Sequence, residues 1–142
     1  MKKRYPMLLI AVVLMLAVGC AKNQNQIKIP KDAAKLIVEF SWKGIQACTH
    51  DSPEIRVSDV PEGTEALRIY LKDIDVPAWN HGGGKVKHDG SGIIPAGALS
   101  IGYNGPCPPK GRHKYEFSVM AVNTEGVIIG FGKARQSFPP KE

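Results

Sequence analysis

The sequence predicts an all-β protein with little helix, built as a sandwich or a barrel. Apolar and polar residues alternate at period two in several runs, as expected for strands with one buried face. No segment shows a helical period over ten or more residues. Fifteen glycines and eleven prolines separate the runs at the spacing of strand-joining turns, which favours many short strands over a few long helices.

Six runs are predicted strands. The clearest alternation lies in residues 35–42, 65–73 and 113–122, and shorter runs at residues 54–57, 99–103 and 127–131 are bounded by Gly or Pro. The side chains predicted to face the core in the three clear runs are Leu36, Val38, Phe40 and Trp42; Leu67, Ile69 and Leu71; and His113, Tyr115, Phe117, Val119 and Ala121.

The N-terminus predicts export from the cell. Basic residues at positions 2–4 precede an apolar run, residues 7–18, which is too short to span a bilayer but suits a secretory signal peptide. The small residues before Cys20 resemble a bacterial lipobox, although Ala17 stands where that motif usually has leucine. We therefore expect residues 1–19 to be a signal peptide and Cys20 to be lipidated. An ordinary signal cut nearby, or an uncleaved anchor, is the alternative.

Processing at Cys20 would leave one domain on a tether. Residues 20–32 would form the lipidated cysteine and a flexible linker, and residues 33–142 the folded domain. Ala21 lacks the aspartate associated with inner-membrane retention in enteric bacteria. The expected location is thus the bacterial cell envelope, lipid-anchored in the outer membrane.

The charge of the processed chain is modest. Removal of residues 1–19 takes three of the 19 basic residues and leaves 16 against 13 acids, a net charge of +3. Nucleic-acid recognition calls for a basic stripe with interleaved aromatics, whereas the basic residues between positions 85 and 114 are loosely grouped. No nucleic-acid partner is expected, and attraction to anionic lipid or a phosphate-bearing ligand stays open.

Two cysteines remain besides Cys20. In an oxidising compartment Cys48 and Cys107 suit a disulfide, which would close a loop of about 60 residues and stabilise the fold by roughly 4 kcal/mol in the chain-entropy account. The alternative is two separate small core residues, since sequence does not fix the distance between them.

A stiff loop leads into the strand that begins at His113. Residues 103–112 read YNGPCPPKGR, in which three prolines fix φ and remove backbone donors while two glycines permit conformations that other residues resist. A histidine at the start of such a strand is usually a hydrogen-bonded core residue. A ligand contact becomes the better interpretation if a second polar motif lies beside it.

That second motif is DIDVPAWNH, residues 73–81. It resembles the D-P-D-A-P and W-x-H region of the phosphatidylethanolamine-binding protein family, and YNGPCPPKGRHKY resembles the family's second signature, Y-x-G-P-x-P-P-x-G-x-H-x-Y. Residues 52–75 also look like the family's bacterial branch. The resemblance covers residues 40 to 123.

The resemblance implies a β-sandwich of two antiparallel sheets with a small anion pocket at one end. The residues that match the family's motifs, and are therefore expected to bind a ligand, are Asp73, Trp79, His81, Gly105, His113 and Tyr115. Imidazole and hydroxyl donors suit a phosphate ester or a phospholipid head group, and Asp73 is able to hold one imidazole in its donor tautomer. The expected function is non-enzymatic ligand binding, with no cofactor.

Two departures from the family's motifs affect this site. Ile74 and Val76 replace Pro and Ala in the first motif, which predicts a less rigid loop after Asp73. After His81 the family continues into an apolar strand, whereas residues 82–92 read GGGKVKHDGSG and predict a flexible or tightly turning stretch.

Other functions are weaker alternatives. Relatives are described as kinase or protease inhibitors, so a protein-interaction regulator with a vestigial pocket is the second hypothesis. The HGGG run suggests an esterase oxyanion loop, but the G-x-S-x-G elbow is missing. Cys48, His50, His81 and His88 lack zinc-ligand spacing, so no metal is expected. Asp73 and Asp75 are more plausibly a histidine partner and a turn former than an acid/base pair.

Overall fold

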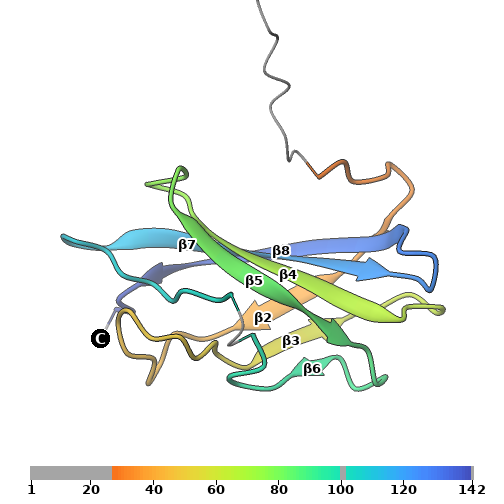
Figure 1. The fold of residues 1–142 in the computed structure, drawn as a ribbon, viewed down its shortest axis with the longest axis horizontal. Helices are drawn as coiled ribbons and strands as arrows, with labels where there is room; N and C mark the ends of the chain where they lie inside the picture. Colours follow the sequence, from red (N-terminus) through yellow and green to blue (C-terminus); the bar gives the residue numbers. More distant parts are fainter. Residues whose placement is uncertain (1–26, 100–101, 142) are drawn as a thin grey trace, which may run out of the picture.

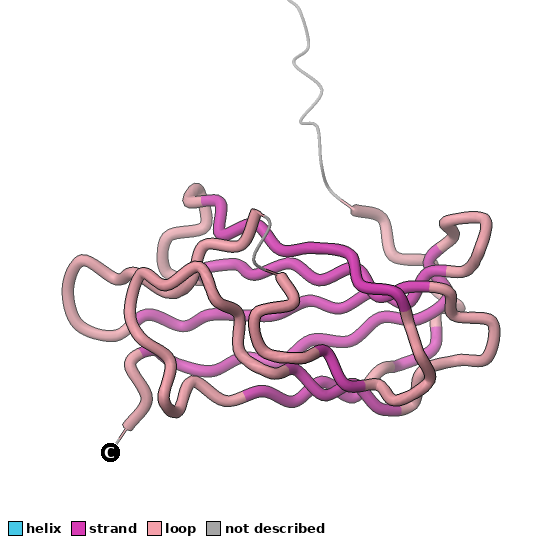
Figure 2. Tube along the Cα trace, turned by 60° about the horizontal axis from the view of Figure 1, so that its bottom comes forward, coloured by secondary structure: helices cyan, strands magenta, loops and turns pink. Residues whose placement is uncertain are grey.

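In the computed structural model, residues 27–99 and 102–141 are described, and they form two packed β-sheets. Figure 1 shows the sheets face to face, and Figure 2 shows loops gathered at both ends of the strands. The larger sheet has the strand order β1-β8-β7-β4-β5, and the smaller has the order β2-β3-β6. The bounds are β1 Ala34–Lys35, β2 Ile37–Phe40, β3 Ile55–Ser58, β4 Ala66–Asp73, β5 Asn80–Lys87, β6 Ile93–Ile94, β7 His113–Val122 and β8 Ile128–Phe138.

The prediction of an all-β sandwich is confirmed. All strand pairs are antiparallel except the short β1–β8 pair, which is parallel. The described residues contain no helix, and hence none long and apolar enough to cross a membrane. The predicted signal peptide, Cys20 and most of the predicted tether lie outside the described residues.

The core lies between the two sheets and is built from the predicted inward faces. Every apolar side chain assigned to the core in residues 35–42, 65–73 and 113–122 is buried. The rings of Phe40, Trp42 and Phe117 pack together, with the Phe40 centroid 4.9 Å from each of the other two. Burial of such aromatic side chains supplies much of the stabilisation of a domain of this size.

Two of the shorter predicted strands differ from the observed ones. Leu99 lies in a turn and the described residues Gly102 and Tyr103 are not in a strand, so the strand expected at residues 99–103 is absent from them. Strand β8 runs to Phe138, seven residues beyond the predicted end. Its second half places glycine, alanine and glutamine inward, so the alternation of apolar side chains that predicts a strand is missing there.

Residues 82–87 of the glycine-rich run belong to strand β5, which corrects the expectation of a flexible or turning stretch there, whereas residues 88–92 form a loop. Gly83 and Gly84 pair with Tyr70 and Ile69 of β4. A Cβ on Gly83 would lie 1.9 Å from the Ile69 carbonyl oxygen. The glycines therefore let neighbouring backbone approach more closely than any side chain would permit.

Candidate functional site

The two motifs meet at one end of the larger sheet. Strand β4 ends at Asp73, which lies opposite Tyr115 of the antiparallel strand β7, so His113 at the start of β7 is close by. Asp73 and His113 both point to the inner face, because each lies an even number of residues from a core position. His113 Nδ1 donates to Asp73 Oδ2 over 2.7 Å. Residues 40 positions apart are thus joined by a partly buried charge-assisted hydrogen bond.

Asp73 also holds the turn that follows β4. Its Oδ1 accepts hydrogen bonds from the backbone N–H groups of Asp75, at 2.8 Å, and Val76, at 3.0 Å. Asp75 in turn accepts the Lys114 N–H at 2.6 Å. Asp73 therefore acts both as the partner of a histidine and as the turn former, two roles that the sequence suggested for Asp73 and Asp75 separately. These hydrogen bonds fix the loop although Ile74 and Val76 replace the family's proline and alanine.

The hydrogen bonds to Asp73 set its charge state. Burial raises the pKa of the carboxyl, but the bonds from His113 and from the Val76 and Asp75 amides outweigh burial and hold the pKa below the ordinary value of 3.8. These donors favour the ionised form. The site therefore contains a carboxylate at neutral pH.

Acid is expected to remove the stability that Asp73 contributes. A carboxyl whose pKa is lower in the folded than in the unfolded state stabilises the fold above its unfolded pKa, and this contribution disappears as pH falls through the folded pKa. The difference in unfolding free energy between the native chain and Asp73→Asn should be constant from pH 6 to 5 and shrink below pH 3.8. Urea denaturation at each pH measures it; a difference unchanged down to pH 2 would contradict the assignment.

The second imidazole comes from His81, at the start of β5. This side chain is 3% exposed, and its Nδ1 lies 2.7 Å from the Asn104 carbonyl oxygen. Since a carbonyl only accepts, Nδ1 carries the proton and donates. Asn104 N donates back to the His81 carbonyl over 2.9 Å. These two bonds orient the ring and leave Nε2 for another partner.

Both imidazoles line one hollow of about 260 Å³. Trp79, which is 63% exposed, forms part of its wall. Four of the six predicted site residues are brought together here. The full lining is Asp73, Val76, Trp79, His81, Cys107, Pro109 and His113.

The other two predicted residues occupy supporting positions. Tyr115 is fully buried, with its ring 5.2 Å from that of His81 and 6.4 Å from that of His113. Burial, with the Asp73 carboxylate adding to it, raises the pKa of its hydroxyl to about 12. The Gly105 N–H donates to the Thr49 carbonyl over 2.8 Å. Neither residue is among those that line the hollow of His81 and His113, and their predicted part in ligand binding stays a prediction.

A disulfide joins Cys48 to Cys107 at the edge of the hollow, which decides between the two alternatives for these cysteines. Their Cα atoms lie 4.6 Å apart, and Cys48 N donates to the Pro106 carbonyl over 2.8 Å. The bridge ties the proline loop to the 44–52 segment. Cys107 and Trp79 also line a second hollow of about 220 Å³, together with Cys48, His50, Asn80, Asn104 and Gly105.

Other polar clusters of the described residues are poorer candidates. A larger hollow, about 420 Å³, lies against the outer face of the smaller sheet, where its charged lining includes the exposed ion pair between Arg56 and Glu54. The charges of such an exposed pair are screened by solvent and interact weakly. Among residues 27–99 and 102–141, no group of three or more histidine, cysteine or acidic side chains is placed to hold a metal.

The chain matches known proteins over most of its length. The family model described as phosphatidylethanolamine-binding protein matches residues 21–139. A UPF0098 protein of Pyrococcus abyssi is 27% identical over 86% of this chain and 91% of its own length. The UPF0098 protein YbcL of Escherichia coli is 32% identical over 75% of this chain and 70% of its own length.

The fold is also similar to a solved structure. The crystal structure of E. coli YbcL, described as a new member of the mammalian PEBP family, superposes with a TM-score of 0.58 at 21% identity. The superposition covers 76% of this chain and all of that one. The agreement extends the likeness from sequence to the arrangement of the strands.

Proposed function

The chain belongs to the phosphatidylethanolamine-binding protein family, and on this premise we propose that it binds a small anionic ligand in the hollow between His81 and His113. The ligand class is a phosphate ester or a phospholipid head group. The protein holds this ligand without converting it.

One observation carries the proposal: two imidazoles line the same hollow, and each has Nδ1 committed to a fixed oxygen. Asp73 engages His113, and the Asn104 carbonyl engages His81, both at 2.7 Å. Each ring therefore has Nε2 left to offer, and a protonated ring donates from it. With both rings protonated and Asp73 ionised, the three groups carry a net charge of +1, which attracts an anion.

The energies fit a weak to moderate binder. Each charge-assisted hydrogen bond contributes about 1.5 to 3 kcal/mol. The wall formed by Val76, Trp79 and Pro109 covers part of the ligand and excludes water from these bonds. The rings are already oriented, so little ordering cost opposes binding.

The lining also favours binding over hydrolysis. Among the described residues, no serine or threonine lines this hollow, and Cys107 is held in the disulfide. Gly82, Gly83 and Gly84, which suggested an oxyanion loop, lie in strand β5 instead. An esterase of the G-x-S-x-G type needs an activated hydroxyl or thiol beside its oxyanion donors, and the described lining of this hollow supplies neither.

Replacement of His113 tests the proposal. Calorimetric titration of the native chain with phosphoethanolamine and with glycerol phosphate should give saturable binding, and His113→Ala should weaken it about 10- to 150-fold, the equivalent of one charge-assisted bond. His88→Ala, a histidine outside the hollow, should bind like the native chain. Absence of binding by the native chain, or equal binding by His113→Ala, would reject the function.

We also propose that Cys20 anchors the protein in the bacterial cell envelope. This rests on the sequence of residues 1–20, which lie outside the described residues. Expression in E. coli followed by mass spectrometry of the purified chain should find a diacylglyceryl cysteine at its N-terminus. An N-terminus without lipid would remove the anchor and leave the ligand site unaffected.

A further inference from the structure

The outer face of the five-stranded sheet, the side turned away from the smaller sheet, carries a strong excess of positive charge. Along each strand, residues that alternate with the buried ones point to this face. These outward-pointing residues include eight cations and one acid, Glu116. We call this surface the basic face; its cations are Lys35, Arg68, Lys72, Lys85, Lys87, Lys114, Lys133 and Arg135.

Two observations distinguish the basic face from an ordinary solvent-exposed face of a sheet. Glu116 is already neutralised by Arg135, at 2.6 Å, and approached by Lys133, at 3.6 Å. The remaining described residues carry seven cations against eleven acids. The described residues thus have a net charge of +7 on the basic face and of −4 elsewhere. Such separation of charge orients a protein toward an anionic surface.

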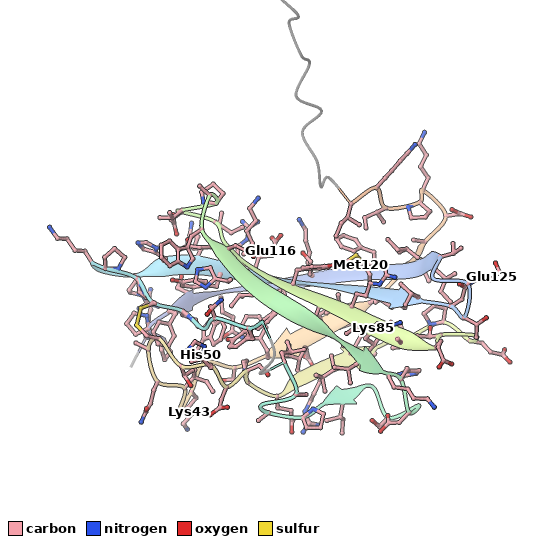
Figure 3. The ribbon with its side chains drawn as sticks, viewed as in Figure 1. Lys43, His50, Lys85, Glu116, Met120 and Glu125 are labelled. Carbon is pink, nitrogen blue, oxygen red and sulfur yellow. A yellow bond between two sulfur atoms is a disulfide. The ribbon has the colours of Figure 1, made fainter. Side chains whose placement is uncertain are left out.

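The basic face also presents apolar groups. Tyr70 is 44% exposed and lines a shallow hollow with Arg68 and Lys85 over the glycines of β5. Phe131, which pairs with the buried Met120, is half-buried on the same face. Figure 3 shows Glu116 and Met120 on the same side of the sheet. Aromatic groups among cations are typical of surfaces that meet the head-group region of a bilayer.

The start of the described chain lies on this same side. Figure 1 shows residues 27–33 next to the sheet on the side away from β2, β3 and β6, with the loop between β4 and β5 rising there as well. That loop carries the exposed side chains of Val76 and Trp79. Any anchor within the 26 residues that precede Ile27 would therefore reach the domain from the side of its basic face.

We propose that the basic face docks on an anionic phospholipid bilayer. The cations meet the lipid phosphates, and Trp79 with its loop enters the interfacial region. The candidate site opens beside that loop, so docking would present its hollow to lipid head groups. The docking rests on the charge of the sheet and does not require the proposed ligand binding.

Vesicle binding tests the proposal. All core residues lie between positions 36 and 138, so the chain from residue 21 onward contains the whole fold and has no lipid. It should float with phosphatidylcholine vesicles that contain 30% phosphatidylglycerol, remain unbound to pure phosphatidylcholine, and detach as salt rises to 0.5 M. A Lys85→Gln, Lys133→Gln double variant should bind the anionic vesicles roughly 30-fold more weakly, since each cation near such a surface contributes about fivefold.

A charge-matched control separates this face from net charge. Lys43→Gln with Arg56→Gln removes two cations outside the basic face and should weaken binding less than threefold. Equal losses in the two double variants, or no binding to anionic vesicles at all, would overturn the proposal. Equal affinity of the native chain for duplex DNA at the same salt would assign the face to nucleic acid and also overturn it. Phosphoethanolamine titration of the Lys85/Lys133 variant should match the native chain, which distinguishes failure of docking from failure of the site.

Discussion

Replacement of Asp73 by Ala is expected to destabilise the domain by about 3 kcal/mol and to abolish measurable anion binding. The substitution removes the acceptor of His113 Nδ1 and leaves two backbone N–H groups, those of Asp75 and Val76, without their partner. Each unsatisfied, partly buried group costs about 1 to 3 kcal/mol. The imidazole also loses the carboxylate that stabilises its charged form.

Asp73→Asn is the matched variant for this prediction. Asparagine keeps an oxygen for the turn but lacks the negative charge, so it should recover part of the stability and little of the binding. Urea denaturation measures the first quantity and calorimetry the second. Equal stability of the native chain and Asp73→Ala would mean that the Asp73–His113 pair does not join the two strands.

Replacement of Gly82 by Ala is expected to destabilise the domain by about 3 kcal/mol or more. Gly82 follows His81 directly and has φ +67°. A Cβ there would lie 1.6 Å from the Gly102 carbonyl oxygen, a separation that no side chain tolerates. Backbone must move to relieve the overlap, and His81 must move with it. The variant should therefore lose anion binding even under conditions where it is folded.

Gly111→Ala isolates the clash from the backbone conformation. Gly111 has a similar φ, +64°, with nothing within 4 Å of the added Cβ. Its substitution should cost only the left-handed conformation, about 1 to 2 kcal/mol. Thermal and urea unfolding of Gly82→Ala and Gly111→Ala compare the two losses of stability directly. Similar losses in both would contradict the close approach of Gly82 to Gly102.

The fold was largely predictable because its core strands alternate strictly. Strands β4 and β7 place apolar residues at every second position, and burial of one face is what such alternation predicts. Strand β5 was missed because local propensity disfavours glycine in strands. In β5 the close approach of neighbouring backbone segments determines that a strand forms. Those segments are distant along the chain, so a short stretch of sequence does not show them.

The sequence predicted which residues belong to the site better than it predicted how they are arranged. Motif matching brought Asp73, Trp79, His81 and His113 together correctly. The strand alternation placed Tyr115 on the core face, and the structure buries it there. The sequence did not reveal that the Gly105 amide is already bonded to Thr49, because that bond depends on packing of the 44–52 segment against the proline loop.

The basic face was not predicted from the sequence because its cations come from five separate strands. Lys85 and Arg68 are neighbours only through the pairing of β5 with β4, and Lys133 joins them only through β8 and β7. Along the chain, each stands alone between two residues that face the smaller sheet. Strand register, which sequence alone does not specify across a whole sheet, creates the surface.

A crystal structure of the native chain soaked in phosphoethanolamine tests directly whether two imidazoles from distant strands share one anion. We expect phosphate density in the hollow beside Trp79, with the phosphate oxygens within hydrogen-bond distance of Nε2 of both His81 and His113. A well-ordered hollow without such density at saturating ligand, or density bound elsewhere on the domain, would contradict it.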